Sequence, residues 1–463
     1  MVFSSLTFLL CFLPLCLLAY FLVPKTWRNG ALFVFSLLFY AWGEPVYVVL
    51  MLFSTALDYT CGQMVERHRG QRGAKIALLV SVCVNFSLLG VFKYSDFLIG
   101  TVNSIFDAAL PLPNLPLPIG ISFYTFQTMS YTIDVYRGEA KAQKNIINFG
   151  AYVTLFPQLI AGPIVRYQTV ADELEHWDCT ADLFAEGVKR FVCGVGKKVL
   201  LANNIGLLWE AASAQTAPTV LTAWLGVIAY GFQLYFDFSG YSDMAIGLGR
   251  MLGFRFLENF NYPFLADSIT DFWRRWHISM GTWFRDYVYI PLGGNRGGLA
   301  KQLRNIAIVW LLTGFWHGAS WNFVLWGVYF GVLLVLEKLF LLRLLKKLPA
   351  ALRHIYALTL VTISWTLFAF TDISKGLAWL KAMFSGTLFD SGNLYLLLTY
   401  GAMLVICTLA ATPLGKRCYE KITTRLGQRT LTVVDCCGLL CVLTMSMAYL
   451  VSGSYNPFLY FRF

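Results

Sequence analysis

Long apolar runs recur along almost the whole chain and restrict its fold more than any other feature. A run of about 20 apolar residues is long enough to cross a bilayer as one α-helix. We therefore expect an all-α polytopic membrane protein with about ten to twelve transmembrane helices. The apolar runs lie at residues 3–23, 31–53, 75–93, 119–136, 146–165, 188–209, 220–236, 305–319, 321–345, 354–371, 394–411 and 431–451. No stretch between them is long enough to fold alone, so we expect one membrane domain over residues 1–463.

Composition supports this class and indicates how the chain is oriented. Only 13% of the residues are charged, whereas soluble proteins carry about a quarter. The net charge of +11 comes from basic residues in loops, at 66–75, 137–144, 338–353 and 416–429. The positive-inside rule places these loops on the cytoplasmic face of the cell (inner) membrane, beside anionic membrane lipids. Because the basic residues are spread between apolar spans, we expect no nucleic-acid partner.

Two of the five histidines lie in the segment Asp271–Trp326, which carries the strongest functional signals. His317 lies within an apolar run, and an ionisable residue at membrane depth is a functional candidate. Its imidazole could take a proton from an attacking hydroxyl, although a hydrogen-bonded core histidine is the alternative. His277 follows Arg274 and Trp276 in a setting that also suits a solvated interfacial helix.

Arginines and tryptophans near His277 supply further candidates. The arginines could bind either lipid headgroups or substrate phosphates, and they are Arg274, Arg275, Arg285 and Arg296. The tryptophans are interpreted as anchors at the membrane interface, and they are Trp273, Trp276 and Trp283.

Two other motifs have a structural as well as a functional interpretation. The loop Gly293–Gly298 is interpreted as a tight turn at the membrane surface, with a phosphate-binding loop as the alternative. Asp237 and Asp243 are expected to make helix-end hydrogen bonds or to orient a His or Arg, rather than to form a glycosidase pair. No Cys-x-x-Cys pair with a nearby histidine occurs, so no metal is expected. Serine hydrolase, P-loop ATPase and zincin motifs are also missing.

Longer motifs along the chain resemble those of the membrane-bound O-acyltransferase (MBOAT) superfamily, and within it the bacterial branch of alginate O-acetyltransferase membrane subunits. The matching segments are Met1–Ser5, Leu117–Tyr124, Ile133–Gly138, Leu159–Pro163, Gln233–Gly249, Glu258–Asn261, Phe272–Ser279, Trp283–Arg296, Trp316–Ala319, Ser454–Phe458 and Phe461–Phe463. They cover nearly the whole chain.

The resemblance implies a ring of helices around a central catalytic chamber, with two signature histidines that fall here on His277 and His317. It implies acetyl-CoA as the acyl donor on the cytoplasmic side, with no bound cofactor. The acyl group would cross the membrane to an extracytoplasmic partner similar to SGNH hydrolases, which modifies a polysaccharide. D-alanyl transfer to teichoic acid from a carrier protein is the alternative that a related branch suggests.

Residues and resemblance together predict acyl transfer from a thioester to a hydroxyl. His317 would be the general base. His277 would orient the donor or polarise its carbonyl. The expected substrate-binding residues are Arg274, Arg275, Arg285, Asn295, Arg296 and Trp316. A transporter or flippase would instead show inverted repeats and intramembrane charged pairs, and neither is evident. A scaffold of a polysaccharide export complex would tolerate loss of both histidines.

Overall fold

The structure is a computed structural model that describes the whole chain except residues 161, 426, 454–457 and 460–463. Ala161 and parts of the C-terminal motifs, Ser454–Pro457 and Phe461–Phe463, thus lie outside the described residues. The described residues are helical and contain no β-strand, as the sequence predicts. They form two compact units, one of Met1–Phe191 with Tyr241–Leu257, the other of Val192–Gly240 with Glu258–Phe463. Two helices contribute residues to both units, α10 (Ala181–Gly196) and α12 (Val220–Met251).

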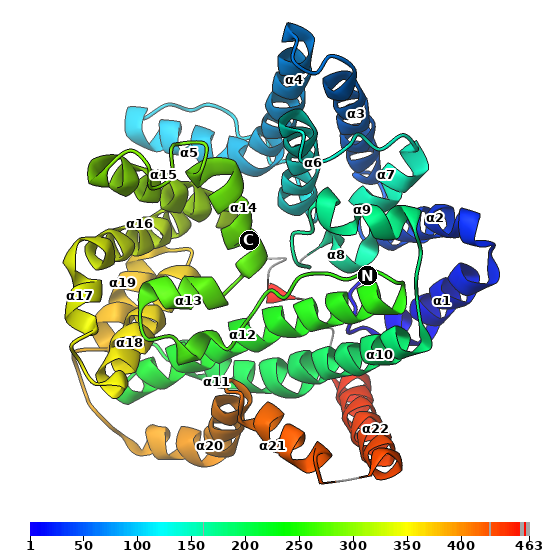
Figure 1. Ribbon diagram of the computed structural model, residues 1–463. Helices are drawn as coiled ribbons and strands as arrows, with labels where there is room; N and C mark the ends of the chain where they lie inside the picture. Colours follow the sequence, from blue (N-terminus) through cyan, green and yellow to red (C-terminus); the bar gives the residue numbers. More distant parts are fainter. Residues whose placement is uncertain (161, 426, 454–457, 460–463) are drawn as a thin grey trace. The chain divides into compact units, whose positions relative to one another are not determined.

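The first unit otherwise contains η1 (Phe8–Phe12), α1 (Leu13–Leu22), η2 (Lys25–Trp27), α2 (Arg28–Ala41), α3 (Val48–Arg67), α4 (Arg72–Leu89), η3 (Gly90–Tyr94), α5 (Ser95–Phe106), α6 (Ile121–Arg137), α7 (Ile146–Thr154), α8 (Phe156–Leu159) and α9 (Tyr167–Glu175). In this unit α3, α4 and α6 pack side by side (Figure 1). The buried carboxylate of Asp58 joins these three helices, because it accepts hydrogen bonds from Ser81, Asn85 and Thr132. A buried carboxylate needs such donors to offset its loss of hydration.

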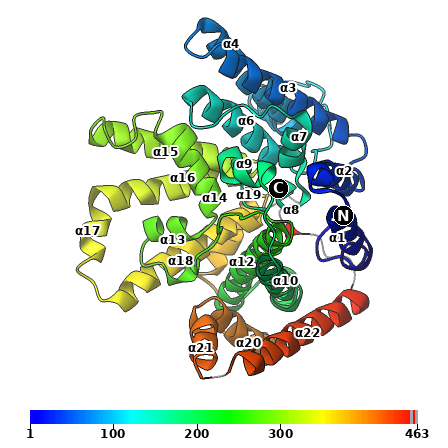
Figure 2. The ribbon, with the colours of Figure 1, turned by 45° about the vertical axis from the view of Figure 1, so that its right-hand side comes forward.

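The second unit otherwise contains η4 (Lys197–Ala202), α11 (Asn203–Ser213), η5 (Pro263–Leu265), α13 (Ile269–Arg275), α14 (Ile278–Phe284), η6 (Arg285–Tyr289), α15 (Leu299–His317), α16 (Trp321–Leu336), η7 (Glu337–Leu341), α17 (Leu342–Leu345), α18 (Ala350–Ala369), α19 (Ile373–Ala382), α20 (Ser391–Ala410), α21 (Leu414–Thr423) and α22 (Gln428–Ser452). In this unit α15 and α16 lie side by side, and α17 leads on to α18 (Figure 2). Gly314 and Gly327 face each other, and a Cβ on Gly314 would lie 2.5 Å from the carbonyl oxygen of Phe323. Small residues therefore allow α15 and α16 to approach closely.

Six helical segments of the described chain are long and apolar enough to cross a membrane: Val48–Arg67, Arg72–Phe106, Ala181–Ser213, Ala350–Ala369, Ser391–Ala410 and Arg429–Ser452. Phe8–Leu22 is a shorter apolar helix. The chain is thus a multi-pass membrane protein, and the total of ten to twelve spans stays a prediction.

Three predicted segments differ from the helices observed. The run at 31–53 is divided, because α2 ends at Ala41 and α3 begins at Val48. The run at 146–165 is not one helix, because Leu155 is non-helical and separates α7 from the short α8. Pro157 is accommodated in the first turn of α8, where its missing N–H is not needed. The run predicted to end at 236 instead continues as α12 to Met251. Asp237 and Asp243 do not end this helix, because each carboxylate pairs with a cation from another element.

Candidate active site

Helix α13, which precedes His277, begins at a well-capped N-terminus. The hydroxyl of Ser268 accepts a hydrogen bond from the backbone N–H of Asp271, 3.1 Å away. The buried carboxylate of Glu337 accepts from the backbone N–H groups of Ile269 at 2.7 Å and Thr270 at 2.8 Å. A carboxylate at a helix N-terminus pairs with the free N–H groups and with the positive end of the helix dipole. Glu337 therefore fixes the position of α13 relative to α16 and η7.

His277 lies at the junction of α13 and α14 in a left-handed conformation, with φ of 46°. This conformation is uncommon for a residue other than glycine, so neighbouring contacts must hold it. Asn259 makes two of these contacts, both with residues that directly follow His277. Its carbonyl oxygen accepts from the N–H of Ile278 at 2.9 Å. Its side-chain oxygen Oδ1 accepts from the N–H of Ser279 at 3.2 Å.

The imidazole of His277 is completely buried, with an exposed fraction of 0%. Its ring lies edge-on to Phe238, with centroids 4.7 Å apart, and its Nδ1 lies 3.1 Å from Oδ1 of Asn259. Burial lowers the pKa of His277 to about 3, because an imidazolium loses its hydration in such a site. The solvated interfacial position that the sequence left open is therefore excluded, and the ring is neutral at physiological pH.

Burial of His277 in its neutral form predicts that acid destabilises the protein. The unfolded state gains a proton near pH 6.5, whereas the folded state gains it only near pH 3. Stability is therefore full above pH 6.5 and is lost as the pH falls. At pH 5 we expect a loss of about 2 kcal/mol from this group. His277→Asn, which tolerates a left-handed backbone, should lose less stability than wild type between pH 7.5 and 5 in detergent unfolding. Equal losses would contradict the assignment.

His317 is the last residue of α15 and is also buried, with an exposed fraction of 4%. The helix ends there because Gly318 is extended and lies against Phe323, where a Cβ would come within 2.3 Å of the ring. The imidazole packs edge-on to Trp326 and Phe368, with centroid distances of 4.8 Å and 5.4 Å. The imidazole therefore lies in apolar, aromatic surroundings.

Trp316 connects the two histidines. Its ring centroid lies 5.8 Å from that of His277 and 5.1 Å from that of His317. The indole is itself buried. The structure therefore brings together three residues that the sequence proposed for the site, although α14, η6 and the glycine-rich loop separate the histidines along the chain.

A pocket of about 590 Å³ lies in the same unit, although His277, Trp316 and His317 do not line it. Arg274 and Arg285 line it together with the apolar rings of Trp273 and Trp310. Arg285 makes a two-point contact with Asp286, at 2.6 Å and 3.0 Å. The guanidinium of Arg274 is exposed and has no hydrogen-bond or ion-pair partner among the described residues. Arg274 is therefore the cation here that is free to bind an anionic ligand.

Two wall residues relate this pocket to the histidines. Ile278 directly follows His277, and Thr313 lies one helical turn before His317. In a helix, residues four apart lie on the same face. The wall of the pocket therefore includes residues from both segments that carry the imidazoles.

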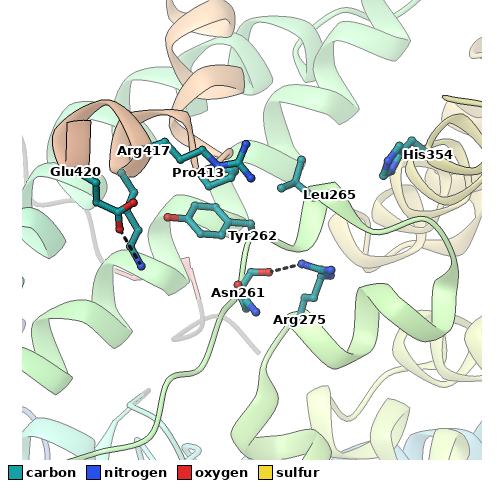
Figure 3. Close-up of a pocket in the computed structure, with 9 residues that line it drawn as sticks. Asn261, Tyr262, Leu265, Arg275, His354, Pro413, Arg417 and Glu420 are labelled. Carbon is teal, nitrogen blue, oxygen red and sulfur yellow. Dashed lines mark hydrogen bonds and ion pairs between the residues drawn. The ribbon is translucent and has the colours of Figure 1, made fainter. Parts of the chain in front are cut away.

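Arg275 lines a different pocket, of about 600 Å³ (Figure 3). Its guanidinium is already paired with Asp271 at 2.8 Å and also donates to the carbonyl oxygen of Asn261 at 3.4 Å. The other charged groups around this pocket are Lys416, Arg417 and Glu420, all from α21. The structure thus separates Arg275 from Arg274 and Arg285, with which the sequence grouped it, because successive helix residues point to different faces.

Asn295 and Arg296 line neither pocket. They lie in a turn that the side chain of Asn305 closes, because it donates to the carbonyl oxygens of Leu292 and Gly294, each at 3.2 Å. Asn295 is occupied by internal hydrogen bonds, since its side-chain oxygen accepts from the hydroxyl of Tyr289 at 2.5 Å. The geometry is that of a surface turn, the first of the two interpretations of this loop.

Other expectations change in the structure. Trp276 and Trp283 are buried within the second unit and pack on other side chains, so their interpretation as interface anchors is wrong. Asp237 pairs with buried Lys198, and Asp243 pairs with Arg190 at 2.6 Å. Because each carboxylate has its own cation, the structure gives no support to a glycosidase pair.

Three residues near the histidines were missed in the sequence: Asn259, Glu337 and Lys198. Asn259 lay within a motif that carried the resemblance, whereas Glu337 and Lys198 were charges within apolar runs, each next to another lysine. Charged residues in such runs are a signal of buried pairing. Within the described residues, no cluster of three or more His, Cys, Asp or Glu could hold a metal ion.

Comparisons with known proteins identify the family of the chain. Residues 137–377, which include both histidines, match the model of the membrane-bound O-acyltransferase family, MBOAT. The probable alginate O-acetylase AlgI of Azotobacter vinelandii is 44% identical over 394 residues, covering 83% of this chain and 78% of the relative. The protein of that name from Pseudomonas putida is 39% identical over 489 residues and covers 100% of both. A peptidoglycan O-acetyltransferase of Helicobacter pylori is 32% identical over 423 residues, covering 83% and 80%.

Proposed function

Because the chain belongs to the membrane-bound O-acyltransferase family and is a multi-pass membrane O-acyltransferase, we propose that it takes an acetyl group from acetyl-CoA for the O-acetylation of an extracellular polysaccharide. The observation that carries the proposal is the contact of Trp316 with both buried imidazoles, in the unit whose pocket is lined by Arg274 and Arg285. Relatives named for the O-acetylation of alginate and peptidoglycan support an acetyl group and a glycan acceptor.

The donor fits the pocket of Arg274 and Arg285 by its chemistry. Coenzyme A carries phosphates on its nucleotide and an apolar acylated arm. Phosphates form strong charge-assisted hydrogen bonds with guanidinium groups. The apolar arm would lie along Trp273 and Trp310 towards the histidines. A donor bound in this way enters from the cytoplasmic face of the cell (inner) membrane.

His317 is proposed as the general base. A neutral imidazole takes the proton from the acceptor hydroxyl as its oxygen bonds to the thioester carbonyl carbon. The carbon–sulfur bond then breaks, and the departing thiolate receives that proton. The hydroxyl belongs either to the glycan or to a group that carries the acetyl onward to an extracytoplasmic partner acyltransferase. The chain itself supplies the donor pocket and the proton transfer.

Acetyl-CoA turnover by protein reconstituted in lipid tests this proposal. Wild type should release coenzyme A and form an acetyl ester with an added glycan acceptor and partner. Arg274→Gln should raise the KM for acetyl-CoA roughly 10- to 100-fold with little change in kcat, because it removes one charge-assisted hydrogen bond. Arg72→Gln, an exposed arginine at the start of α4, is the matched control. Turnover of an acylated carrier protein but not of acetyl-CoA would refute the donor.

A further inference from the structure

We propose that Asn259 is a positioning residue that holds His277 in the neutral tautomer with its proton on Nδ1, so that Nε2 presents a lone pair to the reacting groups. The assignment to reacting groups rests on the proposed function. The placement of the proton itself follows from hydrogen bonds among Asn259, His277 and Ser279.

The orientation of the Asn259 side-chain amide is set by the backbone N–H of Ser279. Its Oδ1 lies 3.2 Å from the backbone nitrogen of Ser279. A backbone N–H can only donate, so the atom that faces it must be the oxygen and not the NH₂ group. The carbonyl oxygen of Asn259 also accepts from Ile278 at 2.9 Å. The backbone and the side chain of Asn259 thus hold the two residues that follow the left-handed His277.

The proton on Nδ1 of His277 follows from this orientation. Nδ1 lies 3.1 Å from Oδ1 of Asn259, and an oxygen that only accepts requires a donor opposite it. The Ser279 hydroxyl is 3.4 Å from Nδ1, but it lies nearer to Oδ1, at 2.9 Å, and donates its single proton there. Ser279 therefore cannot supply a proton to Nδ1, and Nδ1 must carry its own.

The other ring nitrogen, Nε2, is therefore the atom available to the reacting groups. Nε2 of His277 is buried and has no hydrogen-bond partner in the part of the chain that the structure describes. A neutral imidazole protonated on Nδ1 has an acceptor at Nε2. It can accept a hydrogen bond from an N–H of the donor's amide arm or from the acceptor hydroxyl. It cannot donate to a thioester carbonyl, which the carbonyl-polarising role would require.

The ring and hydrogen-bond contacts of the imidazole contain no charged group within the described residues. They are made with Phe238 from α12, Trp316 from α15, Asn259 and Ser279, and none of these side chains ionises near neutral pH. The tautomer is therefore set by one amide, which makes Asn259 a single, testable determinant. Asn259 is buried at 1% exposure, so water does not compete for these bonds.

Nitrogen NMR of the histidine rings tests the proposal without any assay of activity. The full chain is labelled with ¹⁵N-histidine in lipid bilayers, and His277→Asn identifies the His277 signals. Wild type should show Nδ1 protonated and Nε2 unprotonated from pH 6 to pH 8. Asn259→Ala should shift the ring to a mixture of tautomers, and Asn261→Ala, an exposed asparagine two residues away, should not. A protonated Nε2 in wild type, or an unchanged tautomer in Asn259→Ala, would overturn the proposal.

A second variant covers the case in which Asn259→Ala fails to fold. Asn259→Asp keeps an acceptor towards Nδ1 and Ser279, so it should retain the Nδ1–H tautomer, while its carboxylate raises the pKa of the imidazole. Acyl transfer by Asn259→Asp should therefore fail at a higher pH than in wild type as the medium is acidified. Loss of the Nδ1–H signal in this variant would refute the proposal. If wild type shows the expected tautomer but does not turn over acetyl-CoA, the proposed donor fails and the role of Asn259 stands.

Discussion

Replacement of His317 by alanine is expected to lower kcat for acyl transfer by about 10²- to 10⁴-fold, the usual contribution of a positioned general base. The imidazole is buried at the end of α15, and Trp316 links it to the second imidazole. Water cannot replace it as a base there, because Trp326 and Phe368 close two sides of the ring. The measurement is coenzyme A release and ester formation by purified protein in lipid, under saturating donor.

The same experiment must distinguish a loss of catalytic activity from a loss of the folded state. His317→Gln keeps much of the side-chain volume and should be as inactive as His317→Ala, with an unfolding midpoint in detergent close to that of wild type. His176→Ala, at an exposed histidine outside the second unit, should keep full activity. Substantial activity in folded His317→Gln would show that another group takes the proton. It would then point to Nε2 of His277 as the base.

The helical class of this fold was predictable from the sequence, whereas the breaks within it were not. Apolar length alone identifies α18 and α20 as candidate spanning helices, because the requirement to satisfy backbone groups in lipid leaves few alternatives. Length cannot show that Leu155 interrupts a helix or that Asp237 lies in the middle of one. Those outcomes depend on partners distant in sequence, such as Lys198 for Asp237.

The site, like the fold, was predictable from the sequence only in part. His317 stood out because ionisable groups are rare in apolar segments, whereas His277 depended on the resemblance to a family with two signature histidines. The structure joins them through Trp316. Arg275 was grouped with Arg274 because they are neighbours in sequence, yet on a short helix they line different pockets. Proximity in sequence therefore does not show which pocket a side chain lines, because that depends on the direction of the side chain.

Replacement of Lys198 by methionine is expected to destabilise the protein by about 3–5 kcal/mol, the cost of leaving a buried charge without its partner. The side chains of Lys198 and Asp237 are 5% and 1% exposed, so water cannot solvate the remaining carboxylate. Asp237 also accepts from the backbone N–H of Leu459 at 2.8 Å. Both bonds belong to the second unit, next to Phe238, whose ring contacts His277. The measurement is the free energy of unfolding in mixed micelles.

The double variant Lys198→Met with Asp237→Asn decides whether charge or packing is responsible. An asparagine still accepts the Leu459 N–H but carries no charge, so the double variant should recover most of the stability that the single variant loses. Arg190→Met breaks a pair in which the arginine side chain is 30% exposed and the Asp243 side chain 8% exposed. It should cost less, because water already competes for the partly exposed arginine and weakens the pair in the wild type. A double variant as unstable as Lys198→Met would show that the lysine acts through packing. Equal losses for Lys198→Met and Arg190→Met would show that burial does not set the cost.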